Sequence, residues 1–344
     1  MERKRKIDEV KNYYGETLSS NKDLQTSACC IEGSIPDYQK NILSLIDDDI
    51  KNKFYGCGSP IPPSLNGIKA LDLGCGTGRD VYLLSNLVGE SGHVYGLDMT
   101  DNQLETAKKH QASQAKAFGY KTTNTTFKKG YIENLKEADF DDNSLDLIVS
   151  NCVINLSPDK DTVFKEIFRT LKPGGELFFS DVFADRRIPE ELRNDPVLYG
   201  ECLSGAMYIE DFRRTLSSCG CADYRVFNER KMDINNPDIE KKIGHINFYS
   251  ITVRAFKLDL EDRCEDFGQK ATYLGTCHES PAAFVLDDHH TFKVNETVPV
   301  CGNTADMLSE TRYKTHFKIE GKKDIHRGLF DCGPIEKKPS TNCC

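Results

Sequence analysis

The amino-acid sequence predicts an α/β protein built on a doubly wound parallel sheet. Short apolar runs that are typical of buried strands alternate with helical segments from about residue 67 to residue 258. A glycine-rich loop joins the first of these strands to the helix that follows it, as is common where such sheets bind ligands. Beyond residue 258 the alternation stops, and prolines among mixed polar and apolar residues indicate a smaller second domain.

Each element is predicted from its apolar pattern and its flanking residues. An uninterrupted apolar run favours a buried strand, whereas apolar residues at helical spacing that end at glycine or proline favour a helix. The predicted strands are 68–74, 93–99, 125–130, 145–151, 175–183, 223–228 and 248–256, and the predicted helices are 7–20, 36–54, 79–89, 101–118 and 159–171. We therefore expect an N-terminal helical extension (1–66), the sheet domain (67–258) and a smaller C-terminal mixed α/β domain with a polar tail (259–344).

The composition argues against several classes of protein. The 344 residues carry a net charge of -9, whereas a nucleic-acid binder is expected to carry a basic surface, so we expect no nucleic-acid partner. No stretch approaches the roughly 18–20 apolar residues that span a bilayer, and the basic N-terminus lacks the apolar core of a secretory signal. The sequence therefore predicts a cytoplasmic protein without a membrane partner.

Fourteen cysteines are many for a cytoplasmic protein, and in a reducing compartment they should be thiols. Close pairs occur at Cys29-Cys30, at Cys219-Gly220-Cys221 and at Cys343-Cys344, but no spacing is typical of a zinc site. Metalloid binding or redox chemistry is therefore favoured, although an individual cysteine is more often a small buried apolar residue. The adjacent His289 and His290 lie in a polar stretch and are expected at the surface.

The sequence DLGCGTG (72–78) follows a predicted strand and opens a helix. Gly74, Gly76 and Gly78 allow tight turns and a close approach of the backbone to a ligand. Asp98 ends the next strand, 20 residues after Gly78, where its carboxylate can accept hydrogen bonds from two ribose hydroxyls. Strand, loop, helix, strand and acid fall in the order that a nucleoside-binding site requires. We interpret Cys75, inside the loop, as a packing residue only.

This block resembles the first motif of class I S-adenosylmethionine-dependent methyltransferases, because its spacing is GxGxG rather than the dinucleotide GxGxxG. The segments GYIENL (130–135), VSNCVINL (149–156) and LKPGGELFFSD (171–181) resemble later motifs of that family. The resemblance implies a Rossmann-like fold and S-adenosylmethionine as the cofactor, with Glu133 accepting from the adenine amine and Ile132 near the ring. Further candidate cofactor contacts are Arg79, Met99 and Asn151.

Three cysteines are candidates for a thiol site. Cys152 directly follows the strand 145–151, so it should lie at the edge of the sheet where such folds bind ligands. Cys202, in GECLSGA, follows the fifth strand in a segment that commonly covers the substrate cavity of this fold. Cys57, in FYGCGSP, lies on a glycine-flanked loop before the first strand.

The segments TSAC, FYGCG, SNCVINLSPDK and GECLSGA are together very similar to arsenite methyltransferases, and the similarity covers most of the chain. The resemblance implies that Cys57, Cys152 and Cys202 bind trivalent arsenic and that Cys29 is a fourth, redox cysteine. Cys30 departs from the family pattern, which leaves open which member of that pair acts. The family's C-terminal domain accounts for the residues beyond 258.

The chemistry of arsenic suits this arrangement. Trivalent arsenic is soft and prefers thiolate ligands, and three thiolates leave a lone pair on arsenic that can attack the sulfonium methyl without a general base. Methylation yields pentavalent arsenic, which Cys29 and Cys57 can reduce by forming a disulfide that glutathione or a thioredoxin-like partner then reduces. We expect arsenic(III) and methylarsenic(III) as substrates, mono- and dimethylated products, and a role in detoxification.

Two alternatives stay open on the residues alone. A methyltransferase for a small organic acceptor would share the cofactor domain, but no histidine or carboxylate constellation is evident beside Cys152 to serve as its base. A non-catalytic, thiol-rich metalloid-binding protein would need neither the glycine loop nor Asp98. Glu201 could assist thiol deprotonation, although a solvated acid on a helix surface is its better interpretation.

Overall fold

The computed structural model describes residues 35–52, 56, 58–195, 198–199 and 202–332. The predicted helix at 7–20 and the candidate residues Cys29, Cys30 and Cys57 lie outside the described residues. The chain divides into two compact units between Asp259 and Leu260, and each is described by itself. Within the described ranges, no helix is both long enough and apolar enough to cross a membrane.

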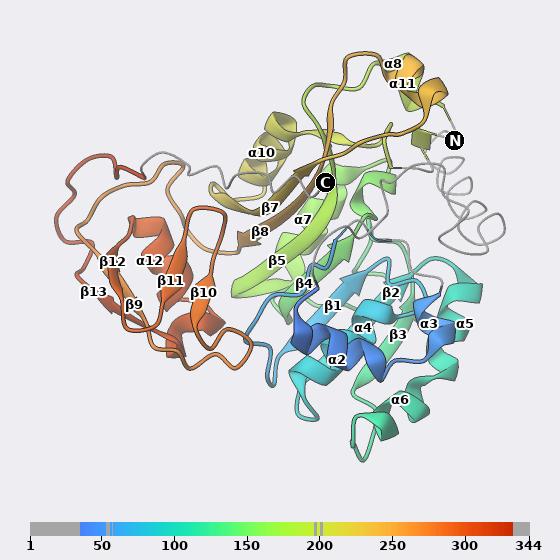
Figure 1. Ribbon diagram of the computed structural model, residues 1–344, viewed down its shortest axis with the longest axis horizontal. Helices are drawn as coiled ribbons and strands as arrows, with labels where there is room; N and C mark the ends of the chain where they lie inside the picture. Colours follow the sequence, from blue (N-terminus) through green and yellow to red (C-terminus); the bar gives the residue numbers. More distant parts are fainter. Residues whose placement is uncertain (1–34, 53–55, 57, 196–197, 200–201, 333–344) are drawn as a thin grey trace, which may run out of the picture. The chain divides into compact units, whose positions relative to one another are not determined.

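The first unit contains an eight-stranded sheet, which confirms the predicted doubly wound topology (Figure 1). The strand order is β3-β2-β1-β4-β5-β8-β7, with β6 paired to β5; the first five run parallel, whereas β8 and β7 add antiparallel pairings. The strands are β1 (Lys69–Leu73), β2 (His93–Asp98), β3 (Thr125–Lys129), β4 (Leu145–Asn151), β5 (Leu171–Ala184), β6 (Met207–Tyr208), β7 (Tyr224–Lys231) and β8 (Phe248–Phe256). Because β2 and β4 flank β1 on opposite sides, the carboxyl end of β1 is a topological switch point, where open α/β sheets bind ligands.

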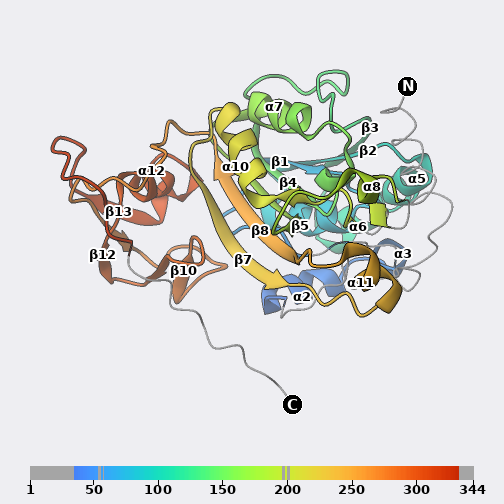
Figure 2. The same cartoon turned by 90° about the horizontal axis from the view of Figure 1, so that it is seen from above.

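Helices cover both faces of this sheet, with α7 and α10 on one face and α2 on the other (Figure 2). The helices are α2 (Asp37–Ser44), α3 (Asp48–Lys51), α4 (Arg79–Val88), α5 (Asp101–Lys109), α6 (Gln111–Ala117), η3 (Ile154–Leu156), α7 (Lys160–Thr170), α8 (Glu190–Arg193), α10 (Ile209–Ser218) and α11 (Pro237–Ile243). Two predicted long helices are interrupted. The segment 36–54 breaks because Asp47 starts a new helix by accepting from the Asp49 amide, and 101–118 breaks at His110.

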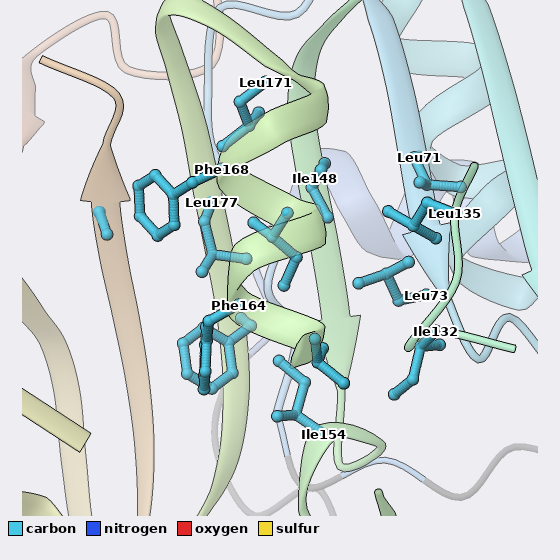
Figure 3. Packing of buried hydrophobic residues seen from close by; sticks show 14 of the residues in the cluster. Leu71, Leu73, Ile132, Leu135, Ile148, Ile154, Phe164, Phe168, Leu171 and Leu177 are labelled. Carbon is cyan, nitrogen blue, oxygen red and sulfur yellow. The ribbon is translucent and has the colours of Figure 1, made fainter. Parts of the chain in front are cut away.

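The described core contains three apolar clusters; two of them lie on opposite faces of the sheet, and the third includes Cys152 and Cys202. Alternate residues of one strand point to opposite faces, so Leu71 and Ile148 belong to one cluster while Ala70 and Leu147 belong to the other. Figure 3 shows the first cluster, in which aromatic side chains of α7 such as Phe164 pack on the sheet. Burial on both faces explains why the parallel strands read as continuous apolar runs in the sequence.

The second unit is a small mixed domain. Its sheets have the orders β12-β9-β13 and β10-β11, and buried aromatic rings such as Tyr273 and Phe317 form its core. Asp287 accepts from the amides of His289 and His290 and from the His290 ring, so this histidine pair forms part of a turn. The elements are β9 (Lys270–Tyr273), β10 (Ala283–Val285), β11 (Thr291–Lys293), β12 (Thr297–Pro299), α12 (Gly302–Ser309), η4 (Arg312–Thr315) and β13 (Phe317–Glu320).

Candidate active site

A cavity lies at the carboxyl ends of β1, β2 and β4, with an empty volume of about 1060 Å³ that includes the open space at its mouth. Nearly all of the predicted cofactor residues line it, and Cys152 lines it as well. The predicted residues that share the cavity are Gly74, Gly76, Arg79, Asp98, Met99, Ile132, Glu133 and Asn151. The structure therefore places these motifs around one space, with a candidate arsenic thiol at its wall.

The glycine loop approaches its neighbours too closely for side chains. Gly74 has φ +69°, and a Cβ there would lie 2.4 Å from a Val153 methyl group. Gly78 is the exception among the predicted cofactor residues, because it does not line the cavity. It caps α4 with φ +89°, and a Cβ would lie 2.9 Å from the Phe127 ring. The sequence motif thus combines residues that face the cavity with one that packs helix against sheet.

Asp98 is fixed at the cavity by the backbone around it. One carboxylate oxygen accepts from the Gly76 amide at 2.9 Å, and the other accepts from the Thr100 amide at 2.8 Å. Burial raises the pKa of Asp98, although these N–H groups act in the opposite direction. Each carboxylate oxygen can accept a second hydrogen bond, so the geometry fits the predicted contact with ribose hydroxyls.

Two further carboxylates in the cavity were not predicted. Burial, together with the nearby charges of Asp80 and Asp98, raises the pKa of Asp72 well above its usual range. Asp80 pairs with Arg79 at 3.2 Å. This acidic wall suits a cofactor that carries a sulfonium and an ammonium group. Asp72 could have been found from the sequence, because it is the first letter of the glycine motif.

Glu133 is hydrogen-bonded to a residue of the turn that begins at Cys152. Its carboxylate accepts from the Ser157 hydroxyl at 2.5 Å, and Ser157 is itself buried and lines the cavity. We call residues 152–157 the cysteine turn. This turn therefore has a candidate arsenic ligand at one end and a partner of the predicted adenine acceptor at the other. Nothing in the local pattern of the sequence indicated Ser157, because its partner lies 24 residues away.

Asn151 is engaged mainly with protein groups. Its side chain accepts from the Gly58 amide at 3.2 Å and donates to the Gly58 carbonyl at 2.9 Å and to Asp80 at 3.1 Å. Gly58 has no room for a side chain, since a Cβ would lie 2.4 Å from the Ser180 hydroxyl. The segment that carries the Cys57 motif is thus attached, at its described residue Gly58, to the strand end that precedes Cys152.

Cys152 and Cys202 lie together, and both have left-handed backbones. Their φ angles are +58° and +61°, which is uncommon for residues with a Cβ. Both are buried, and the Cys202 thiol donates to the Cys152 carbonyl at 3.5 Å. The sulfur of Cys152 is disulfide-bonded in this structure, so arsenic can bind it only after that bond has been reduced to the thiol. Strained backbone of this kind is common at functional sites.

Two more contacts attach the Cys202 segment (residues 198–199 and 202–206) to the cysteine turn. The Tyr199 hydroxyl donates to the Leu156 carbonyl at 2.6 Å. Gly205 lies against the turn so closely that a Cβ would be 2.2 Å from the Asn155 carbonyl oxygen. Segments about 50 residues apart in the sequence therefore meet beside the cofactor cavity.

Cys75 also lines the cavity, but its environment differs, because it belongs to an apolar core cluster and its sulfur packs against Gly96. Burial, with the charges of Asp98 and Asp72, raises the pKa of Cys75 well above its usual range. Because the thiolate is the form that binds metalloids, Cys75 is poorly suited to be an arsenic ligand.

Comparisons with known proteins show the family of this chain. Residues 64–229 match the family described as "Methyltransferase domain", and residues 268–342 match "Arsenite methyltransferase C-terminal domain". The chain is 47% identical to an arsenite methyltransferase of Aquipseudomonas alcaligenes over 98% of this chain and 99% of that protein. It is 41% identical to the arsenite methyltransferase of Homo sapiens, over 96% of this chain and 88% of the human protein.

A solved structure is also similar over the full length of its own chain. It is the crystal structure of an arsenic(III) S-adenosylmethionine methyltransferase from Chlamydomonas reinhardtii, with a TM-score of 0.84 and 46% identity. The similarity covers 87% of this chain and 100% of that chain.

Proposed function

We propose that this chain, which belongs to the S-adenosylmethionine-dependent arsenite methyltransferases, methylates arsenic held by the thiolates of Cys57, Cys152 and Cys202. The observation that carries the proposal is the meeting of Cys152 and Cys202 at the wall of the cofactor cavity. Cys57 is included because it directly precedes Gly58 in the sequence, and Gly58 is hydrogen-bonded to the side chain of Asn151.

The cavity residues have distinct parts in holding the cofactor, which supplies an electrophilic methyl group on a sulfonium sulfur. Asp98 would accept from the ribose hydroxyls, and the backbone at Gly74 and Gly76 leaves room for close approach. Glu133, whose carboxylate accepts from the Ser157 hydroxyl, would accept from the adenine amine. The buried carboxylates Asp72 and Asp80 would stabilise the positive charge of the bound cofactor.

The thiols position the substrate rather than act as acids or bases. Three thiolates neutralise trivalent arsenic and leave its lone pair available, so methyl transfer requires no proton abstraction. Cys152 at a strand end and Cys202 on the adjoining segment are held by the fold, which limits the geometries that bound arsenic can adopt. Alignment of this kind lowers a barrier by several kcal/mol.

A reduction must follow each methylation that yields pentavalent arsenic. Two thiolates, from Cys57 and from Cys29 or Cys30, give two electrons to arsenic and become a disulfide. A small thiol such as glutathione, or a thioredoxin-like protein, returns two electrons by thiol–disulfide exchange. Trivalent methylarsenic then has one ligand position fewer, and the pair Cys152 and Cys202 suffices to hold it for a second methylation.

The test is single-turnover product analysis of cysteine variants with arsenite and with methylarsenic(III). Cys152→Ser and Cys202→Ser should each slow both reactions by at least about 100-fold, because arsenic is then misaligned. Cys219→Ser, half-buried in the turn after α10, is the matched control and should behave as the parent. Parent rates in the Cys152→Ser, Cys202→Ser double variant would contradict the proposal and favour another acceptor.

The same measurement separates permanent ligands from transient ones. Cys57→Ser and the Cys29→Ser, Cys30→Ser double variant should lose the first methylation but retain appreciable methylation of supplied methylarsenic(III). Both cysteines of the pair are changed because Cys30 can replace Cys29. Equal losses on the two substrates would mean that all the thiols form one indivisible site.

A further inference from the structure

The cysteine turn is held from β5 through three consecutive residues of that strand. The Cys152 amide donates to the Ser180 carbonyl at 2.8 Å. The Asn155 amide donates to the Asp181 carboxylate at 3.0 Å, and the Asn155 side chain donates to the Val182 carbonyl at 2.5 Å. The strand therefore fixes the turn at both its beginning and its middle.

Asp181 supplies the only side chain among these three strand contacts, and it is buried. Its second carboxylate oxygen accepts from the Val182 amide at 2.8 Å. A group that accepts from amides on both the strand and the turn connects the two rigidly. Asp181 does not line the cofactor cavity, so its effect on chemistry must pass through the turn.

We propose that Asp181 is a positioning residue that holds the cysteine turn in the left-handed conformation that directs the Cys152 thiol toward arsenic. This inference rests on the proposed function, since it assumes that Cys152 is an arsenic ligand. A non-glycine residue with φ +58° relaxes toward ordinary backbone angles unless its surroundings prevent it. The amide of the turn that Asp181 binds, that of Asn155, lies three residues after Cys152, where it controls the path of the chain.

The ionised carboxylate is required at this position because only that form presents two acceptor oxygens and no donor. Asparagine has nearly the same shape, but its NH₂ group would face one of the amides that Asp181 now accepts from. A buried amide left without an acceptor favours a rearranged turn. Asp181→Asn therefore removes the positioning interaction with a minimal change in volume.

The test measures arsenite affinity, from the ultraviolet absorption of arsenic–thiolate bonds, and S-adenosylhomocysteine affinity, by calorimetry. Asp181→Asn should weaken arsenite binding about tenfold or more and leave S-adenosylhomocysteine affinity within about twofold. Asp185→Asn is the matched control, because Asp185 lies just beyond β5 and binds Arg186 and Asn247 instead. It should leave both affinities unchanged.

A thermodynamic cycle distinguishes positioning from a general structural role. In a Cys152→Ser background, Asp181→Asn should weaken arsenite binding no further, because the thiol that it positions is absent. The inference would be overturned if Asp181→Asn reduced arsenite affinity equally in the parent and in the Cys152→Ser background. It would also be overturned if Asp181→Asn bound arsenite as tightly as the parent. If Cys152→Ser by itself leaves arsenite affinity unchanged, the proposed function fails rather than the role of Asp181.

A second variant covers the case in which Asp181→Asn does not fold. Asn155→Ala keeps the carboxylate and its amide contacts but removes the side-chain bond to the Val182 carbonyl. We expect arsenite affinity to fall by about threefold, because one of the hydrogen bonds that hold the turn is lost. An unchanged affinity in this variant would likewise overturn the inference.

Discussion

The active site has two parts, the glycine loop at the cofactor cavity and the thiol site at Cys152 and Cys202, and both contain residues with left-handed backbone for different reasons. In the cofactor loop it is adopted by glycines such as Gly74 and Gly76, which have no Cβ to clash. At the thiol site it is adopted by Cys152 and Cys202, for which this conformation costs roughly 1–2 kcal/mol each. The first region needs only its backbone close to a ligand, whereas the second needs a sulfur atom and must accept the strain.

The difference teaches how the strain is offset. The loop at Gly74 requires little beyond small size. The cysteine turn, in contrast, is held by hydrogen bonds that its amides donate to Ser180 and Asp181 and by the contact with Cys202. Chemistry that requires a side chain at a strained position therefore recruits supporting residues from neighbouring segments. Three predictions break or sharpen this comparison.

The largest effect should come from removing the carboxylate on the cofactor side. Asp98→Ala should weaken S-adenosylmethionine binding by about 1.5–3 kcal/mol, because a buried, charged hydrogen bond is lost. Arsenite binding should stay within about twofold, since the two halves are held by different contacts. Calorimetry with each ligand measures both affinities. Unchanged cofactor affinity would rule out the ribose contact, and an equal loss of arsenite affinity would show that the halves are not separable.

A smaller effect tests the backbone strain directly. At position 152 or 202, glycine should give a more stable protein than alanine by about 1 kcal/mol, because glycine adopts a positive φ without a clash. At Cys221, buried in the turn before β7 with an ordinary backbone, alanine should be the more stable of the two. Denaturant unfolding of the six variants compares the three sites. The same order at all three would show that the cysteine turn is not strained.

The third prediction is a pH dependence of stability at the thiol site. Burial raises the pKa of Asp181 to about 7. The folded protein therefore binds a proton here more strongly than the unfolded chain, whose aspartates titrate near 4. The stability from this group is complete below about pH 4 and is lost as the pH rises toward 7.

Thermal unfolding of the parent and of Asp181→Asn at pH 5 and pH 8 measures this contribution. Between pH 5 and pH 8, the melting temperature of the parent should fall by a few degrees more than that of the variant. The pKa values of Asp72 and Asp98 are raised as well, but both groups are present in the two proteins, so their contributions cancel in the comparison. Identical pH dependence in parent and variant would show that Asp181 keeps an ordinary pKa.

Much of the cofactor side could be predicted from the sequence. Strand, glycine loop, helix and acid are close in the chain, and each has a local pattern that reflects backbone geometry and burial. The doubly wound fold was predicted in this way, whereas the family and S-adenosylmethionine as the cofactor were implied by the resemblance of the motifs to known methyltransferases; all three are confirmed. The places of Cys152 after β4 and of Cys202 beyond β5 also followed from strand order.

Other features were decided only by tertiary structure. The bond from Ser157 to Glu133, the attachment of Gly58 to Asn151 and the contact of Asn155 with Asp181 join segments 24 to 93 residues apart. No periodicity or local motif encodes such pairs, because each depends on where the sheet brings two strand ends together. The left-handed backbone of Cys152 and Cys202 is likewise invisible in the sequence, since intrinsic preference disfavours it and only surrounding contacts stabilise it.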